Sequence, residues 1–355
     1  MATKSTDILQ EGWGSVLMYG AIHLLVDVAS ISFYLLLLRQ AAFAEPLVIF
    51  LLYIMFAFAT QAPLGYLADR FGCSAAVAVL GCLFVAIGTC LSSFPLLGLL
   101  ILGIGNAMFH VGGGIVTLSL SQSRATLLGI FVAPGTLGIA IGTTLGAANR
   151  HPALIFAGLL VIATIVIIMT GHPRRHTDNT EPPKKPPSKL WDLLSVAILL
   201  LCATVALRQI VGSFGGGAAK EWHYAVPIAV FLGKALGGIL ADRFGWHRFT
   251  VVVILLSAPL LFCANTSPLA GVVGSFLFTM SMPVTLAALA VLLPGRPGTA
   301  FGIASLAIAF GGFACLFIAD DHWTLFALVC LTAYLFHVGM LCYNERVGVI
   351  RSFSE

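Results

Sequence analysis

One acid lies deep inside an apolar stretch of this chain. Asp27 is surrounded in sequence by apolar residues, and His23 lies four positions before it, so both side chains share one face of a helix. A carboxyl group kept from water beside an imidazole can exchange a proton near physiological pH. We expect Asp27 to be a proton-coupling site that His23 tunes. The alternative is a static hydrogen-bonded pair that steadies two helices.

A later apolar stretch repeats the four-residue spacing with Asn106 and His110. We expect these two side chains to line a cavity opposite the first helix and to bind substrate, although a histidine in a helix is as often a packing residue. His23, Asp27 and His110 are also nitrogen and oxygen donors suited to a divalent metal ion. Metal transport is therefore an alternative, but we expect no bound metal, because bases elsewhere in the chain argue against a cation site.

Those bases lie in the second half of the chain. Arg208 stands beside Gln209 within one apolar stretch, and Lys234 lies within the next. Arginine offers a forked set of donors for carboxylate or phosphate, and lysine supplies a compact charge. They predict an anionic or zwitterionic substrate. The alternatives are an ion pair of Arg208 with Asp27, and a Lys234 that pairs with Asp242 or extends to the membrane interface.

The composition indicates that these residues lie in a membrane protein. Hydrophobic residues make up 59% of the 355-residue chain and charged residues 9%, against roughly 25% charged in a soluble domain. A helix crosses the bilayer core with about 20 apolar residues. Twelve such stretches can be marked, near 14–38, 46–68, 74–92, 94–120, 126–147, 152–171, 191–214, 222–241, 248–265, 268–293, 298–319 and 323–343.

The longest polar interruption, residues 172–190, is rich in proline, lysine and arginine and is typical of an unpacked linker. We expect one six-helix bundle over 1–171, a basic cytoplasmic linker over 172–190, and a second bundle over 191–355. Lysine and arginine concentrate in the linker and in alternate short loops, which predicts that both termini and the linker are cytoplasmic. The net charge of +4 reflects this asymmetry, not nucleic-acid binding.

Two segments of the chain nearly repeat each other. Gly65-Tyr66-Leu67-Ala68-Asp69-Arg70-Phe71-Gly72 recurs as Gly238-Ile239-Leu240-Ala241-Asp242-Arg243-Phe244-Gly245, 173 positions later. In the same register Gly129 corresponds to Gly302, Gly138 to Gly311 and Gln61 to Lys234. Each aspartate is expected at a cytoplasmic helix end, where it can accept hydrogen bonds from a neighbouring helix N-terminus and pair with a base.

The glycine-containing helix end followed by Asp-Arg-x-Gly resembles the signature loop of the major facilitator superfamily. The resemblance covers the whole chain. It implies an all-α membrane protein of twelve transmembrane helices in two pseudo-symmetric six-helix bundles around an alternately opening cavity. The repeated residues would then form a conformational latch, comprising Gly65, Asp69, Arg70 and Gly72 in one half and Gly238, Asp242, Arg243 and Gly245 in the other. The basic pair usual after the last glycine is absent from the first copy, so we expect a weaker latch there.

Two shorter stretches resemble particular branches of that family. Residues 133–138 are similar to the glycine-proline element of antiporters, and residues 105–110 with the following glycines are similar to the fourth helix of fosmidomycin-resistance exporters. Both favour export by proton antiport. Proton-coupled uptake of an organic acid would use the same residues, and a non-transporting sensor or scaffold is a further alternative.

We therefore predict a secondary active transporter with Asp27 and His23 as proton-coupling residues. The predicted substrate-binding residues are Gln61, Asn106, His110, Arg208, Gln209 and Lys234. The sequence contains no phosphate-binding glycine loop or nucleophile motif, so we expect neither an enzyme nor a cofactor. We expect a monomer in a bacterial inner membrane whose partners are a small-molecule substrate, protons and the lipid bilayer.

Overall fold

The chain is represented by a computed structural model that describes residues 2–40, 45–170, 188–214, 222 and 224–354. All regular secondary structure in these ranges is helical. A chain this apolar must satisfy its backbone hydrogen bonds within each segment when it crosses lipid, and a helix does so. The expected all-α membrane architecture is confirmed.

The first bundle consists of α1 to α7 and the second of α8 to α14. The helices of the first are α1 (Ala2–Arg39), α2 (Pro46–Ile54), η1 (Met55–Ala59), α3 (Gln61–Phe71), α4 (Ser74–Thr89), α5 (Pro95–Ser121), α6 (Ala125–Ala147) and α7 (Ala153–Thr170). Those of the second are α8 (Ser188–Phe214), α9 (Ala225–Phe244), α10 (Trp246–Phe262), α11 (Pro268–Thr279), α12 (Met282–Leu292), α13 (Pro297–Ala314) and α14 (His322–Ser354).

The described residues contain ten helical segments that are long and apolar enough to span a membrane. Two shorter apolar helices, α4 and α10, occupy the third and ninth predicted positions. Twelve apolar segments thus follow the predicted order, although length and composition qualify only ten as full spans.

Two of the spans are interrupted. The second contains the π-helical turn η1, and the tenth breaks between α11 and α12, just before Pro283. Proline removes a backbone donor and crowds the preceding turn, which accounts for the second interruption.

The predicted linker lies mostly outside the described residues. Its last three positions, 188–190, instead form the first turn of α8. The predicted domain boundaries are otherwise untested by the structure.

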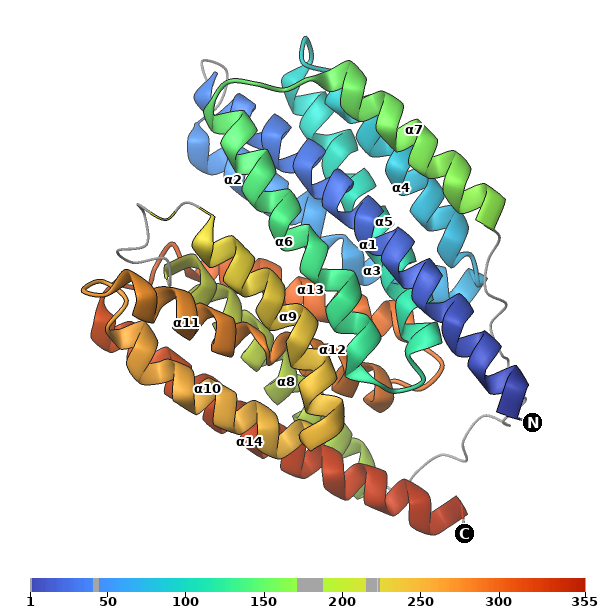
Figure 1. Cartoon of the computed structure of the whole chain (residues 1–355), viewed down its shortest axis with the longest axis vertical. Helices are drawn as coiled ribbons and strands as arrows, with labels where there is room; N and C mark the ends of the chain where they lie inside the picture. The colour runs from blue at the N-terminus through green and yellow to red at the C-terminus, as the bar shows by residue number, and fades with distance from the viewer. Residues whose placement is uncertain (1, 41–44, 171–187, 215–221, 223, 355) are drawn as a thin grey trace.

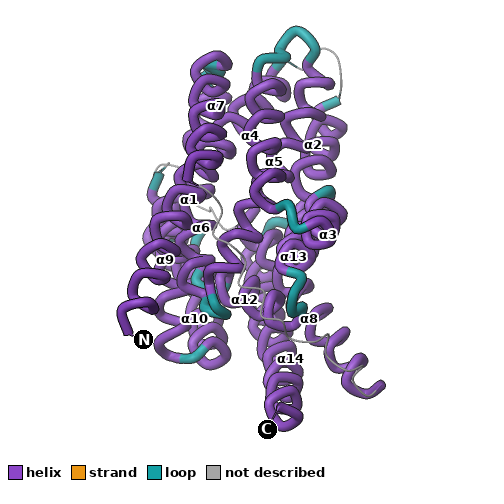
Figure 2. The backbone as a smooth tube through the Cα atoms, turned by 90° about the vertical axis from the view of Figure 1, so that its right-hand side faces the viewer, coloured by secondary structure: helices purple, strands orange, loops and turns teal. Residues whose placement is uncertain are grey.

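The two bundles meet along a few helices (Figures 1 and 2). Across the interface, α6 packs against α9 and α3 packs against α13. Small residues permit this approach: a Cβ atom on Gly129 would lie 2.5 Å from the carbonyl oxygen of Lys234, and one on Gly302 would overlap that of Gln61. These two contacts obey the 173-residue register, so the interface itself is pseudo-symmetric.

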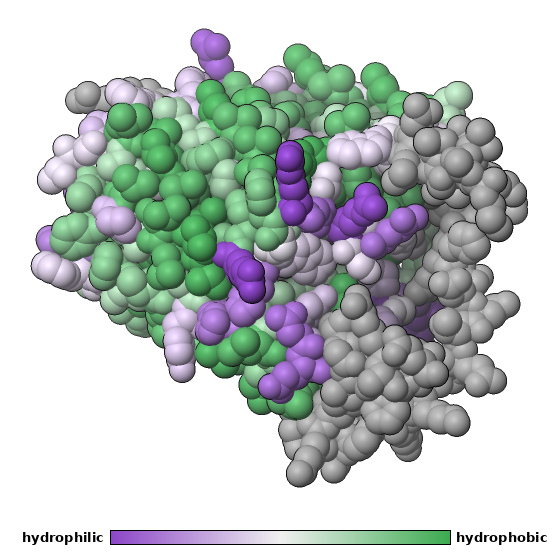
Figure 3. All heavy atoms as spheres, turned by 60° about the horizontal axis from the view of Figure 1, so that its bottom comes forward, coloured by the Kyte–Doolittle hydropathy of each residue, from purple (hydrophilic) through white to green (hydrophobic). Residues whose placement is uncertain are grey.

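The surface is suited to lipid. Large apolar side chains are exposed on the helices, including Leu154, Met169 and Phe317, which are 82%, 80% and 74% exposed. In the space-filling view apolar side chains cover much of the visible surface, while hydrophilic side chains gather together within it (Figure 3). Exposed apolar patches of this extent mark a surface that contacts a membrane or another protein.

Candidate functional site

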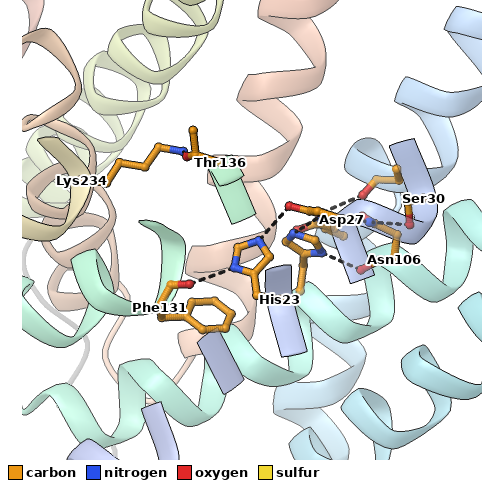
Figure 4. A network of polar contacts seen from close by, with 10 residues as sticks. His23, Asp27, Ser30, Asn106, Phe131, Thr136 and Lys234 are labelled. Carbon is orange, nitrogen blue, oxygen red and sulfur yellow. Dashed lines mark hydrogen bonds and ion pairs between the residues drawn. The ribbon is translucent and has the colours of Figure 1, made fainter. Parts of the chain in front are cut away.

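Asp27 lies at the centre of a buried polar cluster between α1, α5 and α6. His23 Nε2 is 3.3 Å from Asp27 Oδ2, and His110 Nε2 is 3.6 Å from Asp27 Oδ1. His23, Asp27 and His110 are only 5%, 6% and 9% exposed, and Figure 4 shows His23 next to Asp27. The structure thus brings the α1 pair together with His110 of α5.

Surrounding groups fix the cluster in place. Asn106 Nδ2 donates to Asp27 Oδ1 and to Ser30 Oγ, both at 3.2 Å. His23 Nδ1 lies 2.9 Å from the Phe131 carbonyl oxygen on α6. Gly135 of α6 faces the cluster so closely that a Cβ atom would overlap His23 Nε2 and lie 2.7 Å from Asp27 Oδ2. No sequence pattern indicates the role of Phe131, because a backbone carbonyl has no side-chain signature.

The two predicted bases of the second half contact hydroxyl groups. Arg208 Nη1 donates to Ser281 Oγ at 3.2 Å and to Thr285 Oγ1 at 3.1 Å, beside the break between α11 and α12. Lys234 Nζ donates to Thr136 Oγ1 on α6 at 2.7 Å. Both bases are half-buried. Among the described residues neither has a carboxylate within ion-pair distance, so the alternatives that paired them with Asp27 or Asp242 are not seen.

The two predicted glutamines do not join the cluster. Gln61 is 1% exposed and its amide donates to the Ala57 carbonyl oxygen at 2.7 Å, immediately after η1. Gln209 Nε2 contacts Ser213 Oγ at 3.5 Å on its own helix. Their predicted roles in substrate binding remain predictions.

The repeated aspartates each bind the N-terminus of a helix in the other bundle. Asp69 accepts hydrogen bonds from the backbone N–H groups of Gly298 and Thr299, at 2.8 and 2.7 Å, and from the Thr299 hydroxyl at 2.8 Å. The first N–H groups of a helix have no partner within it and carry partial positive charge. Arg296, the N-cap residue of α13, supplies no capping side chain. Asp69 therefore caps α13 from across the interface.

Asp242 makes the equivalent contacts with α6. It accepts from the N–H groups of Ala125 and Thr126, at 3.0 and 2.9 Å, and from the Thr126 hydroxyl at 2.6 Å. Ala125 and Thr126 precede Gly298 and Thr299 by 173 positions, so the partners repeat in the same register as the aspartates. The 173-residue register is therefore a sequence signal for the partners as well as for the aspartates.

The other residues of the predicted latch shape this contact. A Cβ atom on Gly65 would overlap the Gly298 carbonyl, and one on Gly238 would overlap that of Ala125. Gly72 and Gly245 end α3 and α9 with φ of 64° and 91°, which favours glycine. Arg70 and Arg243 lie over neighbouring phenylalanine rings, at 5.9 and 5.7 Å. The expected pairing of a base with either aspartate is not found among the described residues.

The two latches differ in one bond. Trp246 Nε1 donates to Asp242 Oδ1 at 2.7 Å, while Cys73 follows Gly72 in the first copy. The Asp242 latch therefore has one hydrogen bond more than the Asp69 latch, and the donor is an indole rather than a further base.

Comparison with known proteins identifies the family. The family model of the Major Facilitator Superfamily matches residues 16–315. The chain belongs to the major facilitator superfamily. A comparison with curated proteins finds no match.

Solved transporters share this major facilitator fold. The Escherichia coli fucose:proton symporter superposes with a TM-score of 0.69 at 16% identity, covering 93% of this chain and 98% of its own. A structure of the transporter FucP in the outward conformation gives 0.66 at 16% identity, covering 94% and 99%. A human organic anion transporter gives 0.63 at 16% identity, covering 92% and 99%. These likenesses show the fold, while the family match over residues 16–315 and the ten apolar spans make the chain a transporter of this superfamily and an integral membrane protein.

Proposed function

We propose that this protein is a proton-coupled antiporter that exports a small organic anion or zwitterion. The observation that carries the proposal is the separation of charge between the bundles. The side-chain hydrogen bonds of Arg208 and Lys234 in the second bundle go to hydroxyl groups of the described residues, whereas the buried acid Asp27 lies in the first bundle. A base without an acid partner is available to an anionic substrate.

Proton and substrate would then act on different bundles. Asp27 takes up or releases a proton, and His23 tunes that exchange. Arg208 supplies forked donors to the substrate and Lys234 a second positive charge. With the predicted orientation, the latches close the cytoplasmic side, so the present conformation is a stage of the cycle that is closed to the cytoplasm.

The named structural relatives support the two parts of the proposal separately. One is a fucose:proton symporter and another is an organic anion transporter. The direction rests on the antiporter-like residues 133–138 and the exporter-like residues 105–110. Metal as the transported substrate is less favoured, since the two bases of the second bundle suit an anionic substrate.

Flux into proteoliposomes tests the proposal. Purified protein is reconstituted with a pH-sensitive dye inside, and a panel of mono- and dicarboxylates, amino acids and phosphate esters is added outside. Antiport makes the lumen alkaline as an anion enters, whereas symport makes it acidic. Asp27→Asn should abolish the pH change, and Asp320→Asn, at an exposed acid, should preserve it. A pH change that survives Asp27→Asn contradicts the coupling site, and no response to any anion contradicts the substrate class.

A further inference from the structure

The two histidines beside Asp27 are oriented by backbone carbonyl oxygens. His23 Nδ1 lies 2.9 Å from the Phe131 oxygen, and His110 Nδ1 lies 2.8 Å from the Asn106 oxygen. A carbonyl oxygen only accepts, so each Nδ1 carries a proton and donates it. In the neutral imidazole the remaining nitrogen, Nε2, then has a free lone pair.

Both Nε2 atoms face the carboxylate of Asp27. With both imidazoles neutral, two nitrogen lone pairs and a negative carboxylate would meet in a buried site with no cation between them. Buried charge and unpaired polar atoms are costly. Nearby, Asn106 Oδ1 is a further buried acceptor, and no described residue donates to it. The cluster therefore contains several hydrogen-bond acceptor atoms that a bound cation would stabilise.

We propose that His23, Asp27 and His110 bind one divalent transition-metal ion of the Zn²⁺ type. Two ligands at about 2.0–2.1 Å from a tetrahedral zinc ion lie about 3.3–3.4 Å from each other. The separations of Nε2 from the carboxylate oxygens are 3.3 and 3.6 Å, and one ligand atom from each residue lies within 4.8 Å of the others. Two imidazole nitrogens and one carboxylate leave a fourth position open.

The surrounding residues have the form of a second coordination shell. Metal-binding histidines commonly donate their other ring N–H to a carbonyl oxygen, and ligating carboxylates are themselves hydrogen-bonded. Phe131 and Asn106 supply those carbonyls, and the Asn106 amide donates to Asp27 Oδ1. The nearby positive charge, Lys234, directs its ammonium to Thr136 Oγ1 (Figure 4).

Binding would hold α1, α5 and α6 together, because Phe131 of α6 fixes the ring of His23. The ion would also occupy the atoms that the proposed proton exchange uses, so Zn²⁺ would inhibit transport. Binding itself needs no transport activity. Failure of the metal site and failure of the proposed function are therefore separate results.

Metal binding to the full chain provides the test. The protein is purified in detergent without a polyhistidine tag, stripped with a chelator, and titrated with Zn²⁺ by equilibrium dialysis. We expect one tightly bound ion per chain. His110→Ala and Asp27→Asn should each weaken binding by tenfold or more. X-ray absorption should report two imidazole nitrogens and an oxygen at about 2.0–2.2 Å.

Histidines at two other sites provide matched controls. His247 Nε2 and His337 Nδ1 lie 2.9 Å apart in an exposed position, and His151 contacts Ser32 and Thr89. His247→Ala and His151→Ala should leave the tight site intact. Gly135→Ala, which removes no ligand, should weaken binding by crowding His23 Nε2. Circular dichroism and size-exclusion chromatography establish that each variant is folded.

Specific results would overturn the proposal. Loss of the ion in His247→Ala but not in His110→Ala would assign it to the exposed histidine pair. Absence of binding to the folded native chain at 100-fold excess over protein would mean that the cluster holds only protons.

Discussion

Arg208 is the residue that most strongly supports an anionic substrate in the proposed function. Its guanidinium already bridges two hydroxyls, Ser281 Oγ and Thr285 Oγ1, and a fork held in this way can still offer donors to a carboxylate. Arg208→Lys should therefore lose anion-driven flux although the charge is kept. A hydrogen bond to a charged group contributes about 1.5–3 kcal/mol, so the apparent affinity should fall roughly 10- to 100-fold.

The control for this prediction is Arg39→Lys, at an exposed position where α1 ends. It should leave the affinity unchanged in the same flux assay. Equal affinity in native protein and Arg208→Lys would show that only the charge at position 208 is used, or that the substrate does not reach it.

His151 gives a prediction about pH. It lies between α6 and α7, where Nδ1 contacts Ser32 Oγ at 2.8 Å and Nε2 contacts Thr89 Oγ1 at 2.6 Å. Burial lowers the pKa of His151 below its usual value, partly offset by the Thr89 carbonyl. The unfolded chain then binds a proton more readily than the folded one. Neutral His151 makes its full contribution to folding stability above the pKa of the unfolded chain, about 6.5. That contribution is lost as the pH falls toward the pKa of His151 in the folded protein.

The melting temperature of native protein should accordingly decline between pH 7 and 5 more steeply than that of His151→Gln, a neutral replacement that does not titrate. His322→Gln, at an exposed histidine, should follow the native profile. Parallel profiles for the native protein and His151→Gln would contradict the assignment.

How far sequence predicts the cluster differs from residue to residue. His23 and Asp27 are one helical turn apart, so their proximity follows from α1 alone. His110 has the same relation to Asn106 on α5, but the meeting of α1 with α5 depends on packing. Thr136 and the Phe131 carbonyl could not be predicted, because ordinary residues acquire these roles only through the position of α6.

At the scale of elements, the contact between α3 and α13 depends on close approach of two backbones. A Cβ atom at Gly65 would overlap the Gly298 carbonyl, whereas nothing lies within 4 Å of one at Gly158 on α7. Gly65→Ala should therefore separate the helices and destabilise the closed state by about 1–3 kcal/mol. Gly158→Ala is the matched control.

Spin labels at Phe71 and Arg296, in a cysteine-free background, measure this separation by double electron–electron resonance spectroscopy. These two sites are exposed and lie in opposite bundles. Gly65→Ala should enlarge the population of longer distances, and Gly158→Ala should reproduce the native distribution. An unchanged distribution in Gly65→Ala would mean that neighbouring atoms relax without parting the helices.

The sequence predicted the order of the helices well because each apolar run must satisfy its own backbone in lipid. The predicted stretches 74–92 and 248–265 each continue three residues beyond the ends of α4 and α10, because their apolar flanks continue into turns. The π-helical turn η1 has no sequence marker comparable to the proline after the break at α12. The glycine register predicted equivalent helices, but not that Gly129 would meet Lys234 across the interface while Gly302 meets Gln61.

At the scale of the whole molecule, the two latches join the same pair of bundles. Each aspartate belongs to one bundle and caps a helix of the other, so opening this side by a rigid-body movement must break both. Two local gates would instead open independently. The two descriptions differ in whether a change at one latch is detected at the other.

Asp242→Asn distinguishes them when spin labels are placed across the distant latch, at Phe71 and Arg296. Loss of charge at Asp242 weakens three hydrogen bonds to α6 and the one from Trp246. If the bundles move as rigid bodies, the closed population across the Asp69 latch should fall although no residue there has changed. Asp69→Asn, observed with labels at Phe244 and Arg124, should have the reciprocal but smaller effect, because the Asp69 latch lacks an indole donor. Free-energy changes of the two variants should add within about 0.5 kcal/mol in the double variant, as expected for separated sites acting on one equilibrium. A shift confined to the substituted latch would instead indicate that each helix pair opens by itself and that the 173-residue symmetry serves packing rather than a shared movement.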